Sequence, residues 1–141
     1  MKQKGQGMVE FAVILPFLIF LTLSIIYTGA MFMDYIQYNN AARDAARDIS
    51  LKQSKYSRTI VANNINNNAD SYKEYAAPVT GLFTPTMHAD FVDVDGNTVP
   101  EESAQDVKVT ITLIPIEFNE PFKTFMFLPE IPIVYKMKIE K

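Results

Sequence analysis

The sequence contains no cysteine and only one histidine, His88, among its 141 residues. Without thiols, the chain cannot form disulfides, redox-active cysteine pairs or thiolate metal sites. A serine–histidine triad or a histidine metal site would have to use His88, which lies in an expected strand with no motif around it. Lysine and arginine are scattered and the formal net charge is −3, which argues against a nucleic-acid-binding face. We expect no catalytic residue, no cofactor and no nucleic-acid partner.

Charge is also absent from Phe11 to Met33. A helix over residues 11–33 would cover about 30 Å, the hydrocarbon thickness of a bilayer, which predicts a single membrane span. A cleaved secretory signal fits poorly, because the charge-free run is too long. Lys2 and Lys4 favour a cytoplasmic N-terminus under the positive-inside rule. We therefore expect a single-pass protein of the cell membrane with its C-terminal domain outside.

The residues in front of the span carry a second pattern. Gly5 is followed five residues later by Glu10, and Phe11 comes next. This spacing resembles the class III signal of type IV pilin-like proteins. The run GQGMVEFAVILPFLIFL, with Pro16 inside it, and the run NNAARDAARDIS at 39–50 are similar to the N-terminal half of TadE-like pseudopilins of the tight-adherence (Tad/Flp) pilus system.

The resemblance implies that residues 1–5 are a leader, removed by cleavage between Gly5 and Gln6. A cut after Gly7 would place Glu10 third in the mature chain, which departs from the pattern. Cleavage after Gly5 creates an ammonium group at Gln6 that can neutralise Glu10 of another subunit at low dielectric. The alternative is a Glu10 carboxylate that stays solvated among lipid head groups.

The same resemblance implies a role and a set of partners. The role is that of a minor pilin or pseudopilin in pilus assembly, adhesion and surface colonisation. The partners are other pilins or pseudopilins, a prepilin peptidase, an inner-membrane pilus assembly platform and membrane lipid. TadE-like and TadF-like roles both stay open. Two alternatives also remain: an uncleaved single-span protein whose outer domain binds a partner or ligand, and a membrane-anchored enzyme.

The helix is expected to continue beyond the membrane, over residues 6–53 in all. Apolar residues recur there at spacings of three and four. These are Tyr35, Tyr38, Ala42, Ala45 and Ile49. Polar residues fall on the opposite side, namely Gln37, Asn40, Asp44 and Arg47.

Assembly contacts are proposed at four positions of this helix. Besides Glu10, they are Pro16, which should bend or loosen the span, and Arg43 and Arg47 beyond it. The two arginines, with the neighbouring aspartates, form either a solvated and mutually compensating face or a contact between subunits.

Residues 54–141 are expected to form an extracytoplasmic α+β domain. Ser57 is the predicted cap of a second helix. Its apolar stripe would comprise Val61, Ile65, Ala69 and Tyr72. Strands are predicted at 87–94, 107–114 and 133–140 from alternating apolar residues. A small antiparallel sheet packed on the outer half of the long helix would bury their apolar faces.

An acidic loop and an apolar cluster complete the candidates. With Phe91 as position one of a calcium loop, Asp93, Asp95 and Glu102 fall at positions three, five and twelve. The first ligand is missing, so Asp95 and Gly96 are better interpreted as a β-turn, and these acids remain weak metal candidates.

The apolar cluster at Phe122–Leu128 is either a loop that completes the core or an exposed contact.

Overall fold

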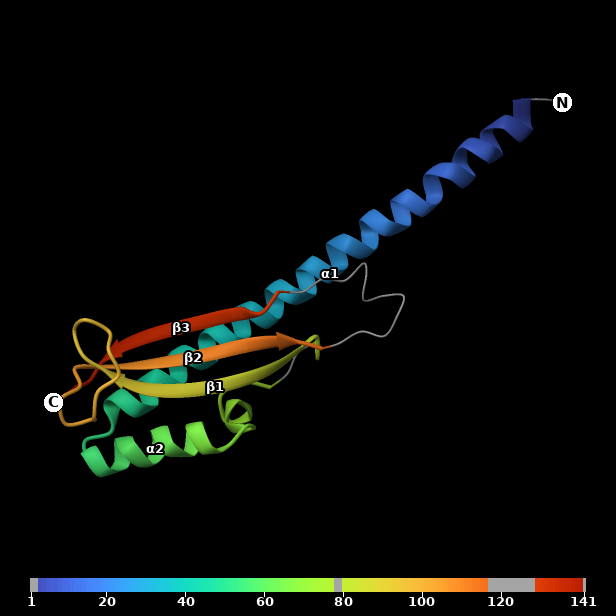
Figure 1. Ribbon diagram of the computed structural model, residues 1–141. Helices are drawn as coiled ribbons and strands as arrows, with labels where there is room; N and C mark the ends of the chain where they lie inside the picture. The colour runs from blue at the N-terminus through green and yellow to red at the C-terminus, as the bar shows by residue number, and fades with distance from the viewer. Residues whose placement is uncertain (1–2, 78–79, 117–128, 141) are drawn as a thin grey trace. The chain divides into compact units, whose positions relative to one another are not determined.

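The computed structural model describes residues 3–77, 80–116 and 129–140, and side chains from Gly7 onward. The apolar cluster expected at Phe122–Leu128 lies outside these residues. Along the chain follow α1 (Gln3–Leu51), α2 (Lys55–Asn67), the short 3-10 helix η1 (Ser71–Glu74), β1 (Phe83–Val92), β2 (Asp106–Pro115) and β3 (Ile131–Lys138) (Figure 1). The chain divides into two compact units, Met1–Met33 and Asp34–Lys141, and each is considered by itself.

The first unit is the N-terminal part of α1. Of the described residues, one helix, Gly7–Leu51, is long and apolar enough to cross a membrane. Its mean hydropathy reaches 2.5, and none of its most apolar window is buried in the structure. A helix satisfies its backbone hydrogen bonds internally, which is the requirement for a segment surrounded by lipid. The predicted apolar N-terminal helix is therefore confirmed, and its length and composition suggest a membrane anchor.

The second unit contains a three-stranded antiparallel sheet in the order β1-β2-β3. Val109 of β2 lies opposite Ala89 of β1 and Tyr135 of β3. All three predicted strands are present, but β1 begins earlier than expected and includes Pro85. Proline is tolerated there because β1 is an edge strand, where an N–H that points outward is not needed by the sheet.

The core of the second unit lies between one face of the sheet and the C-terminal part of α1, which crosses behind the strands in Figure 1. The helix contributes small side chains that allow the strands to approach closely. Ala42, Ala45, Ala46 and Ile49 are 0% exposed. The sheet contributes alternate residues such as Val109, Ile111 and Leu113, which are also 0% exposed. The predicted α+β class, with an antiparallel sheet packed on the long helix, is confirmed.

The stripe expected on α1 is wrong at its first member. Tyr35 is 38% exposed, whereas the adjacent Asp34 is 1% exposed. A prediction from the spacing of apolar residues places Tyr35 in the core in preference to the charged Asp34. It failed here because the Asp34 carboxylate has hydrogen-bond donors in a distant segment, and a bonded carboxylate can be buried.

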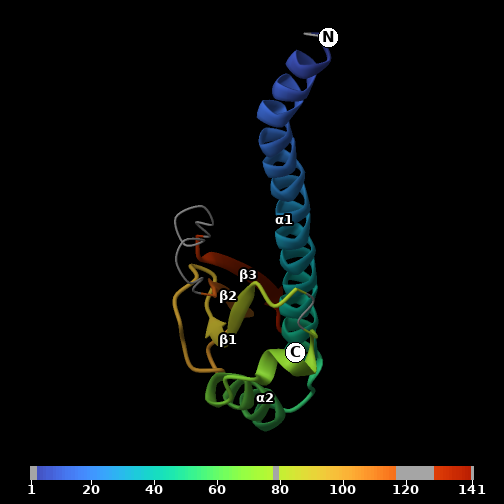
Figure 2. The same cartoon turned by 90° about the vertical axis from the view of Figure 1, so that its right-hand side faces the viewer.

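The second helix begins before the predicted cap. Ser54 occupies the N-cap position of α2 without a side-chain cap bond, so the assignment of Ser57 as the cap is wrong. In the predicted stripe, Ile65 and Tyr72 are buried, but Ala69 is exposed because α2 has already ended at Asn67. The helix lies along β1 at one edge of the sheet (Figures 1 and 2).

Candidate functional site

The main candidate surface is the apolar surface that surrounds α1 in the first unit. Its exposed large apolar side chains range from 40% exposed at Leu15 to 78% exposed at Met8. Apolar surface of this extent is unfavourable in water and requires cover by lipid or by other protein. The surface is therefore suited to a membrane or to a bundle of helices.

Three hydroxyl groups on this surface form hydrogen bonds within the helix. The hydroxyls of Thr22, Ser24 and Thr28 donate to the carbonyls four residues earlier, at 2.7, 2.8 and 2.8 Å. An unsatisfied hydroxyl would be costly in hydrocarbon, so these bonds make the three residues compatible with lipid. These three residues thus leave the apolar character of the segment intact.

The expected processing residues lie at the start of α1. Gly5 and Gln6 belong to its first turns, and Glu10 and Phe11 follow as exposed residues, with Phe11 63% exposed. The helix places Gln6 and Glu10 four residues apart, on the same face and about one turn from each other. A new amino terminus at Gln6 would therefore lie about one turn, roughly 6 Å, before Glu10 along the helix axis.

Pro16 lies inside α1, and the helix continues through it. Because proline has no N–H, the carbonyl of Ala12 loses its usual donor one turn back. This position is a weak point in the backbone of the apolar segment. Its part in assembly stays a prediction.

Arg43 and Arg47 are both exposed on α1, as expected for either of their proposed roles. Asp48 does not serve as a simple counter-ion to them, since its carboxylate pairs with Lys52 at 3.1 Å. Their positive charges are presented to solvent on the outer face of the helix. A contact between subunits at these arginines remains a prediction.

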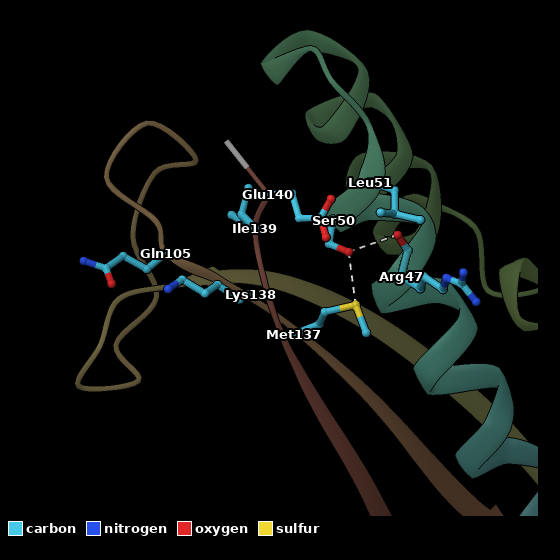
Figure 3. A pocket seen from close by; sticks show the side chains of 8 residues that line it. All are labelled: Arg47, Ser50, Leu51, Gln105, Met137, Lys138, Ile139 and Glu140. Atoms are coloured by element: carbon cyan, nitrogen blue, oxygen red, sulfur yellow. Dashed lines mark hydrogen bonds between the residues drawn. The ribbon is translucent and has the colours of Figure 1, made fainter.

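Arg47 also borders a cavity of the second unit, of about 950 Å³ (Figure 3). Leu51 of α1 and the segment from Met137 to Glu140 form other parts of its wall. The Ser50 hydroxyl lies 3.1 Å from the Met137 sulfur and 3.0 Å from the Arg47 carbonyl, so it joins the helix to β3 (Figure 3). The cavity mixes charges of both signs with apolar surface, and no particular ligand chemistry follows from it.

Asp34 is a buried carboxylate that sequence reasoning missed. It accepts hydrogen bonds from the backbone N–H of Thr80, at 3.3 Å, and from the Thr80 hydroxyl. Nearby, the Gln37 side chain donates to the Ala77 carbonyl at 2.6 Å. These bonds hold the connection before β1 against α1. The only sequence signal is that Asp34 is the first charge after the apolar run.

Tyr38 lies one turn after Asp34 and is 1% exposed. Its ring meets that of Tyr72 edge to face, with centroids 6.2 Å apart. Burial, followed by the nearby charges of Asp34 and Tyr72, raises the pKa of Tyr38 to about 12. The phenol therefore stays neutral throughout the physiological range, which suits a core position.

Arg58 is the second buried ionic residue that the sequence did not reveal. It donates to the Lys52 carbonyl at 2.7 Å, to the Glu101 carboxylate at 3.1 Å and to the Glu140 carbonyl at 2.8 Å. The guanidinium thereby joins the end of α1, α2, the β1–β2 connection and the end of β3. Its partners are far apart in sequence, so no local pattern could have identified it.

His88 lies in β1, as predicted, with a side chain that is 58% exposed. Its Nε2 is 3.1 Å from the Asp90 carboxylate, two residues along the same face of the strand. No nucleophilic side chain donates to it among the residues that the structure describes. The arrangement gives no support to catalysis at this residue.

The acidic loop forms the predicted turn. Gly96 has a φ of +89° and donates its N–H to the Asp93 carbonyl at 3.1 Å. The Asp93 carboxylate accepts from the Asn97 N–H at 2.9 Å, and this bond is the main cause of its lowered pKa. In the described part of the chain, no group of three or more histidine, cysteine or acidic residues, including Asp95 and Glu102, could hold a metal ion.

Comparison with known proteins shows that the N-terminal region is similar to one family. Residues 5–47 match the model of the TadE-like protein family, which is associated with assembly of the Tad pilus. No curated protein and no solved structure matches the chain. The match covers the apolar part of α1, the glycine and glutamate that precede it and both exposed arginines. Over this N-terminal region, the chain is similar to the TadE-like protein family.

Proposed function

We propose that this chain is a minor pilin or pseudopilin of a Tad/Flp-type pilus, cleaved by a prepilin peptidase between Gly5 and Gln6. The observation that carries the proposal is the exposed apolar helix, with Glu10 at its start, inside the region that matches the TadE-like family. Before assembly the helix anchors the chain in the inner membrane, with the second unit outside. In assembly, other pilins replace lipid around the helix.

Charge pairing supplies a reason for Glu10. A carboxylate at the edge of the hydrocarbon region is costly unless a positive charge neutralises it. The ammonium group released at Gln6 is such a charge, and in a bundle each subunit can provide it to a neighbour. The inner-membrane assembly platform and fellow pilins are the partners that this role requires.

The mass of the N-terminal peptide tests the proposal in protein purified from membranes of cells with an active prepilin peptidase. We expect the chain to begin at Gln6. Gly5→Ala should leave the chain uncut, starting at Met1. Gly7→Ala is the matched control, because a Cβ at Gly7 has no neighbour within 4 Å and cleavage should proceed normally.

The alternative is an uncleaved single-span protein whose outer domain binds a partner without polymerising. It would be favoured if the wild-type chain still began at Met1. A chain that begins at Met8 would move the cut to Gly7 and overturn the proposed pairing geometry.

A further inference from the structure

The second unit holds a polar cavity where the end of α1, α2 and η1 meet. Its volume is about 420 Å³, within the range of small-ligand sites. Amide, carboxylate and phenol groups form most of its wall. They belong to Asp48, Asn64, Asn67, Asn68, Glu74 and Tyr75.

The asparagines of this wall come from a helical segment whose residues are poor helix formers. Five of the six residues at 63–68 are asparagine, yet α2 continues to Asn67. Asparagine is a poor helix former because its side chain competes for backbone hydrogen bonds. A conflict between local preference and fold often marks residues that serve another purpose.

Two of the five asparagines have a structural task. Asn66 exchanges two hydrogen bonds with Ala89 of β1, at 2.7 and 2.9 Å. The Asn68 side-chain oxygen accepts from the backbone N–H of Asp70 at 3.0 Å, in the turn that follows α2. The fold therefore accounts for Asn66 and Asn68.

Asn63, Asn64 and Asn67 have no such bond within the described residues, and all three are exposed. Asn64 and Asn67 are three residues apart on one face of α2, and both line the cavity. Each amide offers two donors and one acceptor oxygen. Neighbouring hydroxyl groups of a sugar, which both donate and accept, match such a pair of amides.

Charge in the cavity disfavours an anionic ligand. Lys52, the only cation in the described wall, is 3.1 Å from Asp48 and is neutralised by it. Asp48 also accepts from the Tyr75 hydroxyl at 3.4 Å. Glu74 leaves the wall with a net negative charge. Val61 and the Tyr75 ring add an apolar part, which suits the C–H face of a sugar ring.

We propose that this cavity binds a neutral sugar residue, whose hydroxyl groups hydrogen-bond to the amides of Asn64 and Asn67. Such a site would give the outer domain a ligand of its own. It stands independently of cleavage after Gly5 and of incorporation into a pilus.

Saturation-transfer NMR on the full-length chain tests this proposal, in a detergent without a sugar head group. The probes are glucose, galactose, mannose and N-acetylglucosamine, with glucuronate as the anionic comparison. We expect transfer to at least one neutral sugar and little to glucuronate. Asn64→Ala and Asn67→Ala should each weaken binding at least tenfold. Asn63→Ala, on the same helix but outside the cavity wall, should bind as the wild type does.

These variants keep the result interpretable, because alanine is a better helix former than asparagine and should preserve α2. Circular dichroism of each variant checks this point. The proposal is overturned if none of the four neutral sugars receives saturation, or if Asn64→Ala and Asn67→Ala both bind as tightly as Asn63→Ala. Stronger binding of glucuronate than of every neutral sugar would also overturn it.

Discussion

The guanidinium of Arg58 lies 3.1 Å from the carboxylate of Glu101, and the two side chains are only 7% and 9% exposed. Loss of one partner would leave an uncompensated buried charge, which typically costs about 3–5 kcal/mol. We expect Arg58→Ala to lower the free energy of unfolding by about that amount, measured by thermal or denaturant unfolding of the full chain in detergent. Glu101→Gln should have a smaller effect, because its amide oxygen still accepts.

The exposed pair of Lys73 and Asp70, 2.9 Å apart, is the matched control for the Arg58 pair. Solvent screens such a pair, so Lys73→Ala should leave unfolding almost unchanged. Equal effects of Arg58→Ala and Lys73→Ala would contradict the importance assigned to burial.

Tyr38 should make the second unit sensitive to alkaline pH. Its pKa is raised from 10.0 to about 12 in the folded chain, so the unfolded chain releases the proton first. This difference in the pKa of Tyr38 stabilises the folded chain by about 2–3 kcal/mol below pH 10. The stabilisation is lost as the pH rises to about 12. Unfolding measured from pH 8 to 12 should show this loss.

Tyr38→Phe should flatten that part of the pH profile, while Tyr56→Phe should not, because Tyr56 is 76% exposed. Burial also raises the pKa of Tyr75, so some alkaline sensitivity should persist in Tyr38→Phe. An unchanged profile in Tyr38→Phe would refute the assignment to this phenol.

Asn66 should protect the β1 edge of the sheet. Its two hydrogen bonds to Ala89 occupy a backbone N–H and a carbonyl that another strand could otherwise pair with. Asn66→Ala should cost roughly 1–3 kcal/mol through these unsatisfied groups and should increase aggregation. Light scattering during a thermal ramp measures the second effect. Asn63→Ala is again the control, and aggregation of both variants at the same temperature would argue against edge protection.

Glu10 should matter for assembly rather than for folding of the second unit. Removal of its charge leaves a neighbour's ammonium without a partner at low dielectric, a loss of several kcal/mol. Glu10→Gln should therefore lower incorporation into pili at least tenfold, the equivalent of about 1.4 kcal/mol. Immunoblots of sheared pili against the membrane fraction give the ratio. Glu10→Asp, which keeps the charge, should be incorporated into pili to a greater extent than Glu10→Gln.

His88 should be dispensable. Its side chain is largely exposed and contacts only Asp90 among the described charged groups. His88→Ala should change neither unfolding nor pilus number by more than the error of measurement. A clear loss of piliation, with normal protein levels, would revive an active role for this residue.

The periodicity of single elements was sufficient to predict much of the fold. Alternation in 107–114 predicted β2, and the strand is present with the alternate residues Val107, Val109, Ile111 and Leu113 facing inward. The charge-free run from Phe11 to Met33 predicted the apolar helix, which the structure contains. Both signals are local, because a strand or a helix repeats its own hydrogen-bond pattern along the chain.

The buried polar contacts could not be predicted in this way. Asp34 bonds to Thr80, and Arg58 bonds to Glu101 and to the end of β3, across long stretches of sequence. A charged residue is expected on the surface until its partners are known, because burial of charge is favourable only when it is paired.

The sequence by itself therefore determined the apolar helix, the strands and the similarity of residues 5–47 to the TadE-like family. Each depends on composition and spacing within one segment. Only the tertiary structure decided which charges are buried, that Asn66 hydrogen-bonds to the backbone of the edge strand β1, and that Asn64 and Asn67 line a cavity. These features arise where α1, α2 and the sheet meet, since the hydrogen-bond partners that permit burial come from different segments.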